Sequence, residues 1–211
     1  MNAPVIEVVR VPAGPTFLEA QVVSELRPQA EGILALFAQH ASELADGFSL
    51  WVGWGPLTVR ASAGGFTVEA PDYATDPRAS TTSDLSLVIW LIVGMQAITT
   101  GSDVAPEEVS YTDDVIVTRG ALEAPMLVMS RTAERSPGDS GWFVEPFPQS
   151  ADRDWTPSDL ERMPAWRVLQ SRREVARALA LPSGYSVIVQ PDAIRAVVRE
   201  ADNAVVLSGP A

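Results

Sequence analysis

The sequence contains no cysteine and no lysine, and its single histidine is His40. Without cysteine there are no disulfide bonds, no thiolate nucleophile and no zinc site with cysteine ligands. All 15 basic residues are arginine, which we attribute to genomic base composition and not to function.

Long hydrophobic runs are also absent. The most apolar stretch, residues 85–98, is shorter than the roughly 18–20 apolar residues that a bilayer span requires, and it contains Gln96. Helix-capping residues precede it at 81–84 and Gly101 follows it, so we expect a buried core helix there. The amino-terminal segment has no basic region followed by an apolar one. We therefore expect no signal peptide and a cytoplasmic location.

Acidic residues outnumber basic ones by 27 to 15, which gives a net charge of −12. Both halves share this excess, with 11 acids and 4 bases in residues 1–105 and 16 acids and 11 bases in residues 106–211. The negative electrostatic potential of such a chain disfavours binding to nucleic acid or to an anionic membrane, and it raises the association rate with a basic protein partner. Solubility alone is an equally acceptable reason for an acidic composition.

The apolar pattern predicts an α+β fold of two small mixed sheet-plus-helix units in which antiparallel strands predominate. The first unit is predicted to span residues 1–120. Its expected elements are a helix over 28–44, strands over 48–62 and 65–73 joined across Gly64-Gly65, the apolar helix over 84–99 and a strand over 113–120.

The second predicted unit, residues 121–211, has a similar mixture of elements. Its expected elements are a strand at 126–129, an antiparallel partner at 141–147, a helix start at Thr156-Pro157 and a short strand at 166–170. They continue with a helix within 171–182, with Ser171 and Glu174 as a capping box, and a hairpin around Pro191-Asp192. We expect the boundary between the units near residues 119–125.

Residues 138–141 read GDSG, which is how the nucleophile region of a trypsin-like serine protease looks. Acyl transfer by Ser140 would need a histidine base and an acid that orients it, and His40 lies on a predicted helix outside any protease-like motif. Trp142 also stands where the protease pattern has a second glycine, and its indole would crowd the oxyanion hole. We therefore interpret the tetrad as turn chemistry, with Ser140 and its neighbours in a tight loop before a strand that begins at Trp142.

Other site chemistry is sparse. The acidic candidates Asp113, Asp114, Asp152, Asp154 and Asp159 lack an EF-hand spacing, and no glycine-rich loop is followed by lysine as in a phosphate site. We expect these acids to lie in solvated loops, and we expect no metal and no cofactor. An enzyme that uses Ser140 or a carboxylate pair is the least favoured functional hypothesis.

Two motifs suggest a family. LVMSR at 127–131 and DSGW at 139–142 resemble a family of bacterial immunity proteins from polymorphic-toxin and type VI secretion systems, marked by a strand ending in Ser-Arg or Ser-Lys and by a DSGW box. The resemblance covers roughly residues 114–200, and residues 1–113 resemble no family. The chain departs from the family after the box, where Phe143-Val144 replace the usual DSGWRF continuation. The matching residues are Ser130, Arg131, Asp139, Ser140, Gly141 and Trp142.

The resemblance implies a protein that neutralises a cognate toxin effector in the cytoplasm by stoichiometric binding and occlusion, as a monomer or homodimer and without enzymatic activity. The acidic charge fits a toxin with a basic surface. The alternative is a non-inhibitory adaptor or chaperone that binds a secreted effector.

Tryptophans are the first candidates for contact residues, because tryptophan dominates binding hot spots. Trp51 and Trp54 flank Gly53 on a predicted strand, so they face opposite sides and at most one is exposed. The six indoles are those of Trp51, Trp54, Trp90, Trp142, Trp155 and Trp166.

Trp155 is the best candidate for an exposed anchor, because it lies in the polar stretch ADRDWTPS. Asp152 and Asp154 beside it would supply negative charge to a basic partner. Trp142 and Asp139 of the DSGW box complete the predicted toxin-binding set.

Overall fold

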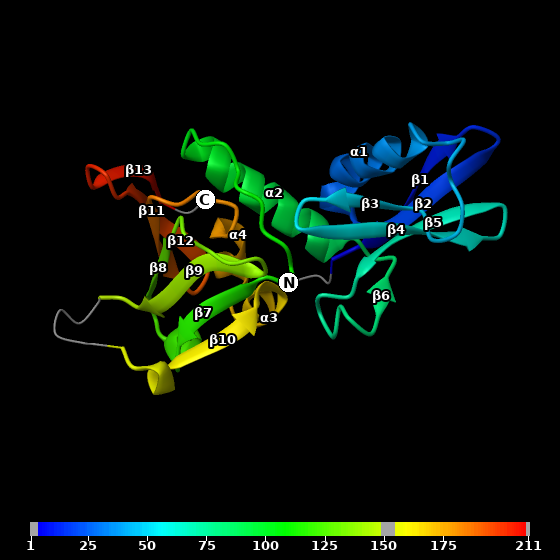
Figure 1. The fold of residues 1–211 in the computed structure, drawn as a ribbon. Coiled ribbons are helices and arrows are strands. Elements are labelled where there is room, and N and C mark those ends of the chain that lie inside the picture. Colours follow the sequence, from blue (N-terminus) through cyan, green and yellow to red (C-terminus); the bar gives the residue numbers. More distant parts are fainter. Residues whose placement is uncertain (1–3, 149–154, 210–211) are drawn as a thin grey trace. The chain divides into compact units, whose positions relative to one another are not determined.

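The protein is described by a computed structural model that covers residues 4–148 and 155–209 (Figure 1). The chain forms two compact units, residues 1–92 and 93–211. Each unit has its own mostly antiparallel sheet with helices, which confirms the predicted α+β fold of two sheet units. The division falls inside the apolar helix α2 (Ser86–Gly101), whose existence the sequence predicted. None of the described helices is both long enough and apolar enough to span a membrane.

The first unit contains a six-stranded sheet in the order β1-β2-β5-β4-β3, with β6 paired to β5. The pair β2–β5 is parallel and the other pairs are antiparallel. Helix α1 (Arg27–Ala38) packs against β1 and β2 through its buried residues, which include Ile33, Leu34 and Phe37. The strands are β1 (Ile6–Ala13), β2 (Thr16–Val23), β3 (Ser49–Val52), β4 (Gly55–Ser62), β5 (Gly65–Pro71) and β6 (Thr81–Thr82).

One strand predicted in the first unit is two strands. The stretch 48–62 breaks at Gly53, whose φ of +65° turns the chain so that β3 and β4 form an antiparallel hairpin. A side chain at Gly53 would also meet the side chain of Ile92 at 2.6 Å. Trp51 is 53% exposed and Trp54 is fully buried, so the prediction that at most one is exposed is confirmed.

The second unit contains a seven-stranded sheet in the order β10-β7-β9-β8-β11-β12-β13. The pair β7–β9 is parallel, and all other neighbours are antiparallel. Helix α3 (Ala165–Ser171) contacts strands β7 and β10, and helix α4 (Arg173–Ala178) contacts strands β11 and β12. The strands are β7 (Asp114–Thr118), β8 (Leu127–Arg131), β9 (Asp139–Pro146), β10 (Leu160–Pro164), β11 (Tyr185–Gln190), β12 (Ala193–Arg199) and β13 (Ala204–Ser208). The strand predicted over 113–120 as part of the first unit is β7, and it belongs to this second sheet. The domain boundary near residue 120 stays a prediction.

The segment predicted as a strand at 166–170 is helix α3. Its residues Ala165, Trp166, Val168 and Leu169 recur at helical spacing and are buried, so the helical period decides the structure. Ser171 ends α3 and does not cap α4, which begins after Arg172. Arg172, between the two helices, donates hydrogen bonds from its guanidinium to the carbonyls of Leu122 and Ala124, at 3.1 and 2.7 Å.

The two faces of the seven-stranded sheet differ in exposure. The core face carries fully or nearly fully buried side chains on successive strands and lies toward α4, because the Trp142 indole donates to the carbonyl of Leu179 at 2.9 Å. Side chains that alternate with the core residues point to the opposite face, where most are partly exposed and Thr118 and Val128 are buried. We call this opposite side the outer face. The core-face residues are Val115, Val117, Leu127, Met129, Trp142, Val144, Val187, Val189 and Val197.

Candidate functional site

The DSGW box lies inside strand β9 and not in a loop, which corrects the predicted tight turn. Asp114 of β7 pairs with Asp139, and Ile116 pairs with Phe143, so β7 advances by two residues while β9 advances by four. The extra length makes the box a bulge in β9. A bulge bends its strand and re-aims side chains, and here it sends the Trp142 indole into the core.

Ser140 and Gly141 hold the bulge together. The Ser140 hydroxyl donates to the carbonyl of Asp114 at 2.7 Å and accepts from the amide of Trp142 at 3.2 Å, so it takes the place of the missing ladder contacts. Gly141 has a φ of +76°, and a Cβ there would lie 2.7 Å from the carbonyl oxygen of Thr132. These requirements explain why serine and glycine stand at these two positions.

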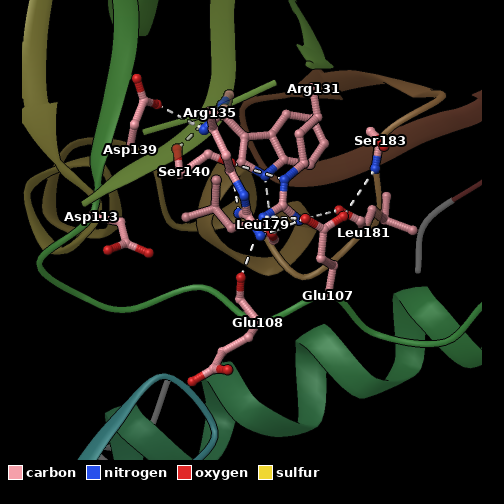
Figure 2. A network of polar contacts seen from close by, with 12 residues as sticks. Glu107, Glu108, Asp113, Arg131, Arg135, Asp139, Ser140, Leu179, Leu181 and Ser183 are labelled. Atoms are coloured by element: carbon pink, nitrogen blue, oxygen red, sulfur yellow. Dashed lines mark hydrogen bonds and ion pairs between the residues drawn. The ribbon is translucent and has the colours of Figure 1, made fainter. Parts of the chain in front are cut away.

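Arg131, at the end of β8, ties the bulge to two other segments (Figure 2). Its Nε donates to the Ser140 carbonyl at 2.9 Å, and its Nη1 donates to the Leu181 carbonyl at 2.6 Å. Longer bonds reach the carbonyls of Leu179 at 3.4 Å and Glu108 at 3.3 Å. One side chain therefore satisfies carbonyls on β9, on the segment after α4 and on the segment before β7.

The charge of Arg131 is fully buried and is compensated by Glu107. The Arg131 Nη2 and the Glu107 Oε1 are 3.5 Å apart, and the more exposed Arg135 binds the same oxygen at 2.5 Å. Burial lowers the pKa of Arg131 to about 10; Glu107 opposes this shift and Arg135 adds to it. Arg131 thus stays charged at neutral pH. The arrangement is a stabilising ion network whose other members are backbone carbonyls.

The two predicted contact residues of the box lie in different environments. Trp142 is fully buried, so its indole is not available to a partner, and its role as a direct contact is corrected to one of packing. Asp139 is partly exposed; it accepts from the Gly141 amide at 2.8 Å and lies 3.7 Å from Arg162. Of these two residues, only Asp139 is exposed enough to contact a partner directly.

Trp155 is half-buried, and its indole donates to Glu145 of β9 at 3.0 Å. Glu145 alternates with the core residue Val144 and therefore lies on the outer face of the sheet. The helix start predicted at Thr156-Pro157 is present as a short 3₁₀ helix (Pro157–Asp159). Thr156 and Asp159 form a capping box there, which fixes the chain directly after Trp155. The predicted residues Asp152 and Asp154 lie outside the described residues.

The side chain of Ser140 stabilises the main chain of the bulge. Its hydroxyl is buried and engaged with main-chain atoms, while His40, in the other unit, lies 3.2 Å from Glu43 and against the ring of Phe48. Among residues 4–148 and 155–209, no three metal-ligating side chains are grouped.

Sequence reasoning missed Glu107 and Glu145. Glu107 was unremarkable in the stretch GSDVAPEE, and its pairing with Arg131 depends on a fold that brings residues 107 and 131 together. The only signal for Arg131 was the Ser-Arg strand end of the resemblance. Glu145 could have been noticed as a lone acid in the apolar strand GWFVEPF.

Comparisons with known proteins give one match. The family model described as the Imm33-like domain matches residues 95–200, a range that contains the bulge, Arg131 and most of the second unit. No curated protein and no solved structure matches the chain. Because the matched range covers half of the sequence, the chain belongs to the Imm33-like family of immunity proteins.

Proposed function

We propose that this protein neutralises a cognate bacterial toxin effector by binding it stoichiometrically and blocking its active surface. The observation that carries the proposal is the Imm33-like match over residues 95–200, because an immunity domain implies a toxin partner. The proposal places the encounter in the cytoplasm, and it assigns the effector to a polymorphic-toxin or type VI secretion system.

The charge of the chain supports a basic partner. A net charge of −12 complements a toxin that binds a polyanionic substrate such as nucleic acid, because the active surface of such a toxin carries arginine and lysine. Attraction of this kind raises the association rate and suppresses wrong partners. A fast association suits an inhibitor that must reach the toxin before its substrate does.

The polar chemistry of the DSGW box supports a binding role over an enzymatic one. Both functional groups that a hydrolase would use there are occupied, since the Ser140 hydroxyl binds main-chain atoms and the Arg131 guanidinium binds carbonyls and Glu107. Within the proposal, Trp155 and Asp139, together with Asp152 and Asp154, are contact residues, and Trp142 acts indirectly by holding the bulge.

Co-expression tests the proposal. The product of the gene adjacent to the one for this protein is expressed in a bacterium, alone and together with this protein, and growth is measured. We expect the neighbouring product to arrest growth alone and the pair to grow normally. If the neighbour is harmless alone, the proposal fails.

A purified system separates binding from inhibition. The adaptor or chaperone alternative predicts a complex in which the effector keeps its activity, whereas neutralisation predicts a complex without activity. Ser140→Ala should still neutralise when it is folded. A folded Ser140→Ala protein that binds the effector and fails to block it would point to catalysis by Ser140.

A further inference from the structure

A continuous row of residues crosses the outer face of the second sheet. Every link in this row follows from the pairing register of neighbouring strands. From β10 to β13 the row is Arg162, Ile116, Phe143, Ser130, Ser186, Val198 and Val205. With neighbouring strands about 4.8 Å apart, the row is about 29 Å long when measured along the sheet.

The chemistry of this row is unusual for a solvent-facing side of a sheet. Antiparallel sheets with one wet face normally alternate apolar and polar residues. Here Ile116, Phe143 and Val198 are apolar and partly exposed, and Val205 is 59% exposed. Beside the row, Ile188 continues the apolar surface toward Ala196. The outer face is therefore mixed: partly exposed apolar side chains lie on both sides of the two small serines Ser130 and Ser186.

Charge on the outer face lies at its margins. Glu145 adjoins Val128 and holds Trp155, and Glu200 accepts from the Ser186 hydroxyl at 2.6 Å. At the β10 margin, Arg162 lies 3.5 Å from Asp114 and 3.7 Å from Asp139, so two acids share one arginine. Glu145 lies on an inner strand but near its end, and among the described residues the part of the row from Ile116 to Val205 carries no charged side chain.

An apolar centre that is poor in charge and contains an aromatic residue, with a polar rim, is the anatomy of a protein–protein interface. A patch about 28 Å on a side corresponds to the roughly 800 Å² that each partner buries in a complex of standard size. The row is about as long as one side of such a patch.

We propose that the outer face of the second sheet is the surface on which the effector docks, with Phe143 and Ser130 at its centre and Trp155 at its margin. This inference rests on the proposed function. The partner that fits presents an apolar centre bordered by arginine or lysine side chains, which meet Glu145, Glu200 and the acids beside Arg162. A second copy of this chain fits poorly, because two chains with a net charge of −12 repel each other.

Three arginine substitutions of equal charge test the face in the full-length protein. Ser130→Arg alters its centre, Val205→Arg alters its exposed end, and Ser171→Arg is the matched control at the exposed end of α3, which packs on the other side of the sheet. Binding to the purified product of the adjacent gene is measured by calorimetry. Circular dichroism checks that each variant is folded. Val205→Arg keeps the test valid if Ser130→Arg does not fold, since Val205 is largely exposed.

We expect Ser130→Arg to weaken binding by about 30-fold or more and Val205→Arg by about fivefold, with Ser171→Arg within about twofold of the unsubstituted protein. Unchanged binding by both face variants, or equal weakening by all three, would overturn the docking face and leave the proposed function intact. A dimer of this protein that the face variants dissociate without loss of effector binding would also overturn it. If the unsubstituted protein does not bind the effector at all, the proposed function fails and the docking face fails with it.

Discussion

The clearest consequence of the bulge concerns Ser140→Ala. The substitution removes a hydroxyl that is fully buried and makes two bonds, one to the Asp114 carbonyl at 2.7 Å and one from the Trp142 amide at 3.2 Å. Both main-chain groups would then be left without this partner in a buried site. Leaving a buried polar group unsatisfied costs about 1–3 kcal/mol, so we expect a loss of about 2 kcal/mol in local stability.

Hydrogen exchange followed by mass spectrometry measures this loss locally, which matters because a chain of two units need not unfold in one step. A loss of about 2 kcal/mol makes exchange of the amides in β8 and β9 about 30-fold faster. Ser136→Ala is the matched control, because Ser136 is exposed and lies only four residues away. We expect the control to exchange like the unsubstituted protein.

The same variant separates structure from catalysis. If Ser140 is structural, the variant neutralises the effector normally at a temperature where it is folded. Unchanged exchange in β8 and β9 of Ser140→Ala would refute the bulge reasoning, because it would show that the hydroxyl carries no part of the local stability.

Three further outcomes follow from the same network. Gly141→Ala should lower the free energy of unfolding by about 2 kcal/mol or more in chemical denaturation, because the new Cβ would lie too close to the Thr132 carbonyl. Gly138 has a φ of +80° and open space around it, so Gly138→Ala should lower the free energy of unfolding by only about 1 kcal/mol, through backbone strain alone. Equal losses in the two variants would contradict the close approach to Thr132. Arg131→Met should cost about 3–5 kcal/mol, because it leaves several buried carbonyls without their donor and removes one of the two arginines at Glu107. Arg135→Ala should cost under about 1 kcal/mol, and a reversed order in melting experiments would contradict the network. Since the pKa of Arg131 is lowered to about 10, the unfolded chain holds a proton above about pH 10 that the folded chain has lost. The stability difference between the unsubstituted protein and Arg131→Met should therefore be flat from pH 7 to 9 and rise above pH 10; a fall there would contradict the lowered pKa.

The alkaline experiment is practicable because of what the chain lacks. Lysine and cysteine normally titrate between pH 8 and 11, and this sequence has neither.

Local periodicity was sufficient for much of the fold. The apolar helix at 84–99 and the hairpins at Gly64-Gly65 and Pro191-Asp192 depend on contacts close in sequence, and all three are present. The strand predicted at 166–170 failed because five apolar-rich residues fit either period, and burial of Trp166 and Leu169 on one helical side decided for a helix. Strands β1 and β2 were not predicted at all.

The DSGW box shows where sequence reasoning stops. Its residue types predict a tight turn, whereas the structure has a bulged strand in which Gly141 has a positive φ and its amide donates to Asp139. That this backbone forms a bulge depends on β7, a parallel neighbour 25 residues earlier in the register, and no local pattern encodes such a partner. For the same reason the Arg131–Glu107 pair and the Trp155–Glu145 bond were missed.

The central claim is that this protein blocks a toxin by occupying its active surface in a one-to-one complex. The most direct test is a titration of the purified effector's activity with this protein. We predict a linear fall in activity that reaches zero at one equivalent. Full activity in the presence of a stable complex, or complete loss of activity at far less than one equivalent, would contradict the claim.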